Sequence, residues 1–562
     1  MTLVVEARRV TGPGMLWEHP GAMLDVEFAP LDPGVVGDLW RLHAGRLLEA
    51  VGWGQEQVLA HVFQGGMTLA ISAPEDQLYT AVSVAEAAGG FCVAALQGVA
   101  APDFAAEVER LRAEAAAEAN PALLALMAAA RGRGLDVLVD DDLVTVGHGV
   151  GSAGWPVRDL PEVVDWDRLH NIPVALITGT NGKTTTTRLC AAIGRAAGFV
   201  AGLTSTDYVQ IGERVLEEGD FSGPGGARML LRDTALEVGF LEVARGGILR
   251  RGLPVGQARA AAVLNVAADH LGEYGVNTVE ALAEAKFAVR RGLAADGVLV
   301  LNADDPLVVA QAQGPAWWFA LSRDAARLRA GALPCAWLED DALVFWDGAE
   351  AIPVIAVADL PIALGGRARH NIQNALAAIC LTRALGIGFE AIRAGLAGFQ
   401  SNVTDNPGRC NEFAVKGARV FVDFAHNPHS IAAVTQTLAG LTGKRCFVMI
   451  SQAGDRSDED IRGLVRGAFV LRPDYVVASE LPGYERGRGP GETSDLIARI
   501  CQDLGMPAQN VLRAASPGAG AALVVARLEP GDLALLLVHG DRDEIFAMLT
   551  AQSDAPTSSK LA

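Results

Sequence analysis

The sequence feature that most constrains the fold is a nine-residue segment, Ile177-Thr178-Gly179-Thr180-Asn181-Gly182-Lys183-Thr184-Thr185. It follows a short apolar run at residues 174–177 and precedes a helical pattern at residues 184–197, which Gly198 ends. Glycines let a backbone turn tightly and direct N–H groups toward phosphate oxygens, and a helix N-terminus adds about half a positive charge. The segment therefore predicts a nucleotide-binding loop between a strand and a helix.

The residue types in this loop suggest how ATP and Mg²⁺ are held. We expect Lys183 to reach the β- and γ-phosphates, and the hydroxyl of Thr184 or Thr185 to hold Mg²⁺. The strict pattern GxxxxGK[ST] is not met, because Ile177 stands where its first glycine would be. A generic loop therefore remains an alternative. The predicted nucleotide-binding residues here are Gly179, Thr180, Asn181, Gly182, Lys183, Thr184 and Thr185.

Strand–loop–helix units recur after this loop up to about residue 400. Apolar strands are expected at residues 239–244, 260–266 and 297–301, with helices between them. This rhythm is typical of a parallel, doubly wound sheet. A second block of the same kind has strands starting near residues 420, 446, 475 and 533. The sequence thus predicts an α/β protein with a central P-loop parallel-sheet ATPase domain and a C-terminal Rossmann-like α/β domain.

The first hundred residues have a different pattern. Short β-like runs at residues 3–5, 23–28 and 67–71 accompany one helical stretch near residues 39–51, which predicts a small α+β domain. Helical patterns at 103–119 and 121–130 follow, and residues 134–151 alternate strand and turn. For a chain of 562 residues, three or four domains are the prior expectation. We expect domains at 1–165, 166–403 and 404–562.

The composition excludes several classes of function. The formal net charge of -20 repels phosphate backbones and anionic lipids, so we expect neither nucleic acid nor a membrane surface as a partner. No apolar run reaches the roughly 18 residues that span a bilayer, and no signal-peptide pattern begins the chain. The seven cysteines form no CxxC pair, so neither a disulfide framework nor a zinc site is indicated. A reducing cytoplasm fits this cysteine usage.

Lysine is rare in this chain. The 46 basic residues include only five lysines, at positions 183, 286, 416, 444 and 560. A chain that uses arginine almost everywhere else keeps lysine mainly where a compact amine that can lose its proton is needed. Lys183 and Lys286 therefore stand out, whereas Lys416, Lys444 and Lys560 are taken as surface residues.

Two polar residues stand at the ends of apolar strands. Glu242 and His270 should lie at the carboxyl edge of the parallel sheet, where the phosphate loop also lies. A carboxylate with hydroxyl and water oxygens suits Mg²⁺, and one histidine is tolerated. A lone histidine is more often a structural residue whose hydrogen bonds are already made. The position of His270 after a phosphate loop favours a role as a metal ligand here.

An ordered series of motifs resembles the Mur ligase family, which joins a carboxylate to an amine using ATP. The resemblance covers about residues 174–550. Its motifs are the phosphate loop GTNGKTT at 179–185, LEVARGG at 241–247, NVAADHLG at 265–272, NADDP at 302–306, HNIQN at 370–374, NPGR at 406–409 and DFAHNP at 423–428.

The resemblance implies a role for individual residues. Glu242 and His270 would be metal ligands, with His270 on a second Mg²⁺. Asn371 and Asn374 would approach the adenine, and Arg409 and Asp423 would contact nucleotide phosphate or ribose. The family also commonly carries a carbamylated lysine at the position of Lys286, which would become a carboxylate-like metal ligand. A lysine that only neutralises phosphate is the alternative.

The cyanophycin synthetase branch of the family shows the greatest likeness. The shared segments are EVARGGILR at 242–250, GDR at 454–456, RGRGPGE at 486–492, RVTGPG at 9–14, AAARGRG at 128–134 and LVTVGHG at 143–149. After Gly149, that branch continues with an ATP-grasp module of some two hundred residues. This chain reaches the phosphate loop about thirty residues later, so the ATP-grasp ligase is missing. A further departure is Asp541, where many Mur ligases have a glutamate.

The resemblance implies an amide ligase that activates a carboxylate as an acyl phosphate and joins it to an amine, such as arginine on an aspartyl-type carboxylate. Catalytic residues would be Lys183, Glu242, His270 and Lys286. The expected substrates are a free amino acid, as a small molecule, and an acidic peptide, and a homo-oligomer (dimer or tetramer) is expected. Alternatives are a degenerate scaffold for a separate ATP-grasp partner, a ligase that extends a γ-glutamyl chain, or a P-loop kinase. Expected substrate contacts are His426, Asp455, Arg456, Arg486 and Glu492.

Overall fold

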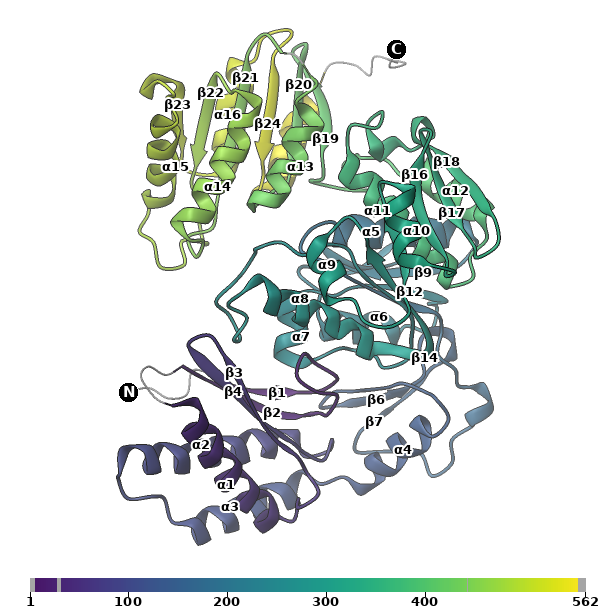
Figure 1. Cartoon of the computed structure of the whole chain (residues 1–562), viewed down its shortest axis with the longest axis vertical. Helices are drawn as coiled ribbons and strands as arrows, with labels where there is room; N and C mark the ends of the chain where they lie inside the picture. The colour runs from purple at the N-terminus through teal and green to yellow at the C-terminus, as the bar shows by residue number, and fades with distance from the viewer. Residues whose placement is uncertain (1–5, 28–31, 442, 554–562) are drawn as a thin grey trace.

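The computed structural model describes residues 6–27, 32–441 and 443–553. The expected β-like run at 3–5, Phe28 and Lys560 lie outside the described residues. Figure 1 shows an N-terminal sheet at the bottom, a large central sheet in the middle and a C-terminal sheet at the top. The α/β fold class expected from the sequence is confirmed. The domain limits at 165 and 403 stay predictions.

The N-terminal unit is a four-stranded antiparallel sheet covered by helices. Its strands have the order β1 (Glu6–Val10), β2 (Gly21–Glu27), β4 (Gly66–Ser72), β3 (Val58–Phe63). The helices are α1 (Pro33–Val51), α2 (Leu78–Gln97) and α3 (Phe104–Glu118). A core that includes Trp40, Leu47 and Phe91 joins the sheet to these helices.

Helix α2 contradicts two expectations. It was missed because apolar and small residues occupy all its faces, which leaves no amphipathic period. By length and composition alone it is also apolar enough to cross a membrane, with a mean hydropathy of 1.4, although no such run was expected. Half of its apolar window is buried in this structure, and its buried residues belong to the core beneath β2 and α1. It is packed here as the core helix of the N-terminal unit.

A small connecting unit follows the N-terminal sheet. Helix α4 (Pro121–Arg131) packs on a three-stranded antiparallel sheet of β5 (Val137–Val139), β6 (Leu143–Val146) and β7 (Ala153–Pro156). The alternation of strand and turn expected at 134–151 lies in this sheet.

The central sheet has eleven strands, and its middle is parallel. In spatial order they are β11 (Arg214–Glu218), β10 (Tyr208–Ile211), β9 (Ala201–Thr204), β12 (Val238–Glu242), β8 (Val174–Thr178), β13 (Ala258–Val263), β14 (Leu293–Asn302), β15 (Trp317–Ala320), β16 (Cys335–Glu339), β17 (Ala342–Trp346) and β18 (Ala351–Ala356). Strands β9 to β16 in this order run parallel, whereas β10, β11, β17 and β18 pair antiparallel at the two edges.

The sequence predicted the parallel middle of this sheet but not its antiparallel edges, where tight turns join neighbouring strands. Asp340 and Asp341 join β16 to β17, and both have positive φ angles, of 47° and 57°. This pair of angles is the requirement of a two-residue type I′ hairpin turn. Such a turn returns the chain beside the strand it has just left, so no crossover helix is needed.

Helices cover both faces of the central sheet. One face packs against α5 (Lys183–Ala196), α11 (Arg369–Ala384) and α12 (Phe389–Gly398). The other packs against α6 (Pro224–Leu231), α7 (Arg245–Arg251), α8 (Val279–Phe287), α9 (Pro306–Gln311) and α10 (Arg323–Ala330). Because the strands are buried on both sides, they are nearly continuous apolar runs.

The C-terminal sheet has the order β19 (Asn411–Val415), β20 (Ala418–Asp423), β24 (Leu533–Leu537), β21 (Cys446–Ser451), β22 (Tyr475–Ser479), β23 (Val511–Ala514). All its neighbours pair parallel except β19 with β20. Helices α13 (Pro428–Leu438), α14 (Asp458–Ala468) and α15 (Glu492–Asp503) cover one face, and α16 (Pro517–Arg527) and α17 (Arg542–Ala551) the other.

All seven cysteines are buried free thiols. Burial raises the pKa of the Cys92 and Cys501 thiols to about 12. A thiol with such a pKa is almost fully protonated near neutral pH, so these cysteines are weak nucleophiles.

Candidate active site

A cleft of about 830 Å³ lies between the carboxyl edge of the central sheet and the C-terminal domain. Most of the predicted site residues line it, although they come from segments far apart in the sequence. They are Thr180, Asn181, Gly182, Lys183, Thr184, Thr185, Glu242, His270, Asn371, Asn374, Arg409, Asp423, His426, Asp455, Arg456 and Arg486. Gly179, Lys286 and Glu492 are not among the residues that line it.

The phosphate loop leaves β8 and enters α5 in a tightly fixed shape. Gly182 has a φ of 86°, and a Cβ added there would meet the Asn374 side chain at 2.3 Å. The Thr180 amide donates to the Asn265 carbonyl at 2.9 Å, and the Lys183 ammonium donates to the Thr180 carbonyl at 3.0 Å. Only glycine fits at position 182, because both the backbone angle and the neighbouring amide exclude a side chain.

Glu242 ends β12 beside this loop and is 2% exposed. The Thr184 hydroxyl donates to its Oε2 at 2.9 Å, whereas its Oε1 has no hydrogen-bond partner in the described structure. Burial raises the pKa of Glu242, and the charge of Lys183 opposes that shift. A buried carboxylate oxygen without a donor, next to a hydroxyl oxygen, fits a hard divalent cation such as Mg²⁺.

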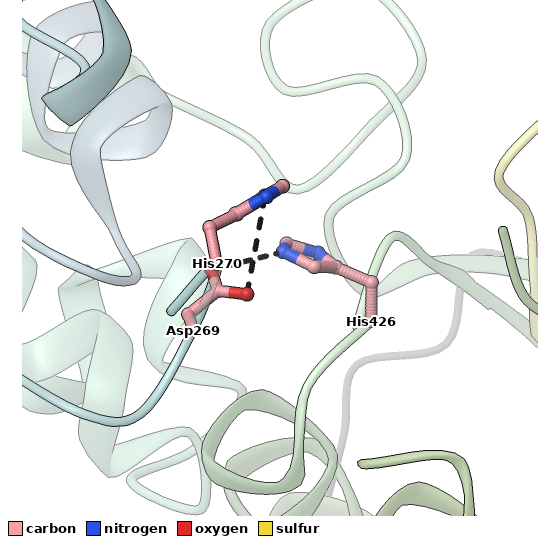
Figure 2. Close-up of side chains that lie close together, drawn as sticks. All are labelled: Asp269, His270 and His426. Atoms are coloured by element: carbon pink, nitrogen blue, oxygen red, sulfur yellow. Dashed lines mark ion pairs between the residues drawn. The ribbon is translucent and has the colours of Figure 1, made fainter. Parts of the chain in front are cut away.

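A second cluster joins the central and C-terminal domains, as Figure 2 shows. Ligand atoms of Asp269, His270 and His426 all lie within 4.8 Å of one another. Arg456 donates through one guanidinium nitrogen to Asp269 Oδ1 and through another to His270 Nε2, both at 2.8 Å. Burial raises the pKa of Asp269, but the hydrogen bond from His426 and the charges of His270 and Arg456 lower it well below its ordinary value.

Two residues of this region stood in the sequence motifs without being predicted as site residues. Asp269 directly precedes His270 on the loop that follows β13, so its position was a signal for a second ligand. Arg245 donates to the His270 carbonyl and to the Glu273 carboxylate, which fixes the loop that carries His270. The N-terminal unit touches the same loop, because the Arg8 guanidinium lies 5.2 Å from the centre of the Tyr274 ring.

Lys286 lies behind the cleft on α8 and is 4% exposed. Burial lowers its pKa well below the ordinary value, and the charges of Lys183 and Arg245 lower it further, against the opposing effect of Asp269. The ammonium makes no hydrogen bond or ion pair with the described residues. A neutral amine is the form that reacts with CO₂, so the environment of Lys286 fits carbamylation.

The nucleotide end of the cleft is built from α11 and the start of the C-terminal domain. Asn374 donates to the Asn371 side chain at 3.2 Å. The Asp423 carboxylate accepts from the amides of Cys410 and Ala425 at 2.8 and 2.7 Å. Burial raises the pKa of Asp423, and the charge of Arg409 opposes that shift.

The far end of the cleft carries the residues expected to contact substrate. Arg486 donates to Asp455 at 2.5 Å. Glu492 instead begins α15, outside the cleft lining. Asp541 caps α17 with a φ of 54° and accepts from the Gly518 amide at 2.9 Å. It does not line the cleft either.

The fold and the cleft define a phosphate-loop α/β protein whose site is completed by a Rossmann-like domain. Family models agree: the Mur ligase middle domain matches residues 177–382, and the Mur ligase glutamate ligase domain matches residues 408–540. The UDP-N-acetylmuramate–L-alanine ligase of Nocardioides is 30% identical over 372 residues, which cover 65% of this chain and 71% of that protein. The chain belongs to the Mur ligase family.

A cyanophycin synthetase of Crocosphaera subtropica is 41% identical over 334 residues, which cover 58% of this chain and 38% of that protein. The chain thus spans about two fifths of the length of the cyanophycin synthetases it matches. Among solved structures, the Escherichia coli protein FolC in complex with ADP, without folate substrate, has a TM-score of 0.50 and 22% identity, covering 67% of this chain and 89% of that one. That likeness concerns the fold alone.

Proposed function

We propose that the chain is an ATP-dependent carboxylate–amine ligase. The observation that carries the proposal is the convergence of Lys183, the buried and half-partnered Glu242, and the Asp269–His270–His426 cluster on one cleft. A carboxylate oxygen of the acid substrate attacks the γ-phosphorus of ATP and ADP leaves. The amine nitrogen then attacks the acyl carbon, and phosphate leaves with that oxygen.

The residues of the cleft divide this work. Lys183 and the loop amides hold the phosphates, and Arg409 and Asp423 approach the nucleotide from the C-terminal domain. Glu242 and Thr184 would hold one Mg²⁺, and His270 with Asp269 and His426 a second. Bound Mg²⁺ would neutralise charge that develops on the transferred phosphoryl group. Catalysis is then mainly the positioning of acid, phosphate and amine in one water-poor cleft.

The finer proposal concerns the substrates. An amino acid such as arginine would be joined to an aspartyl-type carboxylate of an acidic peptide. The 41% identity to a cyanophycin synthetase over the ligase domains supports this choice. The carboxylate of Asp304 on the cleft wall accepts only from neutral groups of the described residues, so it suits a cationic amine. A cytoplasmic homo-oligomer, a dimer or tetramer, is part of the same proposal.

A test compares acid–amine pairs. Purified chain, ATP and Mg²⁺ are incubated with an acidic peptide and each of twenty amino acids, and free phosphate and product mass are measured. Phosphate release that needs both acid and amine supports a ligase, and product mass separates aspartyl from γ-glutamyl products. ADP with a stable phosphoester indicates a kinase. No phosphate with any pair favours the scaffold.

Carbamylation of Lys286 is a separate part of the proposal. Arginine cannot be carbamylated, so Lys286→Arg should lower phosphate release sharply. Removing bicarbonate should lower the activity of the unmodified chain, and adding it back should restore that activity. Full activity of Lys286→Arg, with no bicarbonate effect, rejects the carbamate. The matched control is Lys444→Arg, because Lys444 is exposed and outside the cleft.

A further inference from the structure

A second cavity of about 470 Å³ lies where the N-terminal unit, the connecting unit and the central domain meet. It shares no lining residue with the cleft described above. Its walls come from the start of α2, from α4, from β5 and from α6. Part of the wall is apolar, including Leu123, Met127, Leu253 and Pro254.

The carboxylates that line this cavity are already engaged. Glu75 pairs with Arg131, and Asp141 pairs with Arg9 and accepts from the Tyr79 hydroxyl at 2.7 Å. Glu118 accepts from the amides of Tyr79 and Thr80, both at 2.8 Å.

The two remaining carboxylates are engaged as well. Asp76 accepts from the Asn120 amide at 2.6 Å. Asp140 pairs with Arg232 and accepts from the Leu143 amide at 2.9 Å. Glu75, Asp140 and Asp141 thus pair with arginines, whereas Asp76 and Glu118 accept only from neutral groups, and none of the five pairs with Arg228.

Arg228 is a cation of this wall that lacks a partner among the described residues. It lies on α6, is partly buried and lines the cavity. It makes no hydrogen bond or ion pair with any residue that the structure describes. Burial lowers its pKa, and the charges of Arg232, Arg9 and Arg251 lower it further, with only Asp140 acting in the other direction. A partly buried guanidinium among like charges costs free energy that a bound anion would recover.

We propose that this cavity binds a small organic carboxylate whose anionic group pairs with Arg228. A carboxylate group can pair with the guanidinium of Arg228, the partly buried cation of the wall that has no partner among the described residues; Arg158 also lines the cavity, but its side chain is exposed to solvent. A dianion such as inorganic phosphate would also face the five carboxylates of the wall. The apolar residues suit a short aliphatic body, and the volume suits a molecule of amino-acid size. Because three units of the chain form the walls, the ligand would also stabilise their arrangement.

The test uses thermal unfolding of the full chain with acetate, succinate, glutamate or inorganic phosphate at constant ionic strength. At least one carboxylate should raise the Tm of the unmodified chain by a few degrees, because a ligand of the native state stabilises it. Arg228→Gln should abolish that shift. The control Arg195→Gln removes the same charge from an exposed position on α5, outside the cavity, and should keep the shift.

The ligand-free Tm separates this role from a structural one. Because Arg228 has like-charged neighbours and no partner, Arg228→Gln should leave the ligand-free Tm unchanged or raise it. A clear fall in the ligand-free Tm would mean that Arg228 stabilises the fold, and would overturn the proposal. It is also overturned if no carboxylate shift depends on Arg228, or if only phosphate shows such a shift. The readout does not involve ATP, so it is independent of the ligase activity.

Discussion

The two positions that fit a cation are built in different ways. Glu242 is 2% exposed and lies within one domain, one strand away from the phosphate loop, so the central fold alone fixes it. The His270 side chain is 42% exposed and lies on a loop with a φ of 51°. Its neighbours His426 and Arg456 come from the C-terminal domain.

This difference indicates that the two positions have different roles. The Glu242 position is built from residues of the central domain alone and should serve ATP binding. The His270 position exists only when the C-terminal domain is docked, so it should couple docking to chemistry. Arg456 holds Asp269 and His270 with two hydrogen bonds, and a cation that binds these atoms would compete with it. Mutations at the two positions should therefore have different kinds of effect as well as effects of different size.

The largest effect is expected at the position within one domain. Lys183→Met and Glu242→Gln should each lower ATP-dependent phosphate release by about a thousandfold, because Lys183 would neutralise charge on the phosphates and Glu242 would hold the Mg²⁺ that does the same. The control Lys444→Met should keep normal activity. Retention of more than a tenth of the activity by Glu242→Gln would show that the buried carboxylate is not required.

A smaller effect is expected at the position shared between domains. His270→Ala and Arg456→Ala should each lower activity by about 10- to 100-fold, the range typical of groups that orient or hold a metal. Because the two side chains touch, the double variant should be less impaired than the product of the single effects. Additive losses would mean that Arg456 and His270 act independently.

The buried carboxylate of Glu242 should lower the stability of the ligand-free chain near neutral pH. Its folded pKa is raised by burial, so the unfolded chain loses this proton at a lower pH than the folded chain does. Stability of the ligand-free chain therefore falls as pH rises from the ordinary pKa toward the raised one. Glu242→Gln should match the unmodified chain at pH 4 and have a Tm a few degrees higher at pH 7.

Thermal unfolding with Mg²⁺ and ATP completes that comparison. Bound Mg²⁺ favours the ionised carboxylate of Glu242. It should therefore narrow or reverse the Tm difference between Glu242→Gln and the unmodified chain at pH 7. Burial lowers the pKa of His270 to about 4, so the unfolded chain takes up this proton at a higher pH than the folded chain does. A gain in Tm from His270→Ala should therefore appear at pH 4 and not at pH 7, the reverse of Glu242→Gln. An equal Tm for Glu242→Gln and the unmodified chain at pH 7 would argue against a destabilising buried charge.

The smallest effect is expected at a contact that only assists docking. Arg542 on α17 pairs with Asp207 of the central domain at 2.5 Å, and Asp207 is also paired with the buried Arg188 at 2.8 Å. Arg542→Ala leaves Asp207 with a partner. The change in unfolding free energy, measured by denaturant titration, should be about 1 kcal/mol or less. A larger loss would show that docking depends on this one pair.

The features that the sequence predicted best are those that depend on residues close together in the chain. The phosphate loop, the end of β12 with Glu242 and the loop after β13 with His270 are local patterns, and the structure brings them to one sheet edge. Contacts between distant segments were not visible: Arg456 and Asp269 are separated by 187 positions. Glu492 was placed with the substrate residues because of its motif, yet it begins a helix outside the cleft. Helix α2 was missed because it has no polar face.

The burial of all seven cysteines has a practical consequence. Because every native thiol is shielded and resists ionisation, a cysteine introduced on the surface would be the site that reacts with a maleimide probe. Two such positions, one on α12 and one on α14, would place a donor and an acceptor fluorophore on the central and C-terminal domains. Energy transfer between them would then follow the approach of the two domains during turnover, without prior removal of any cysteine.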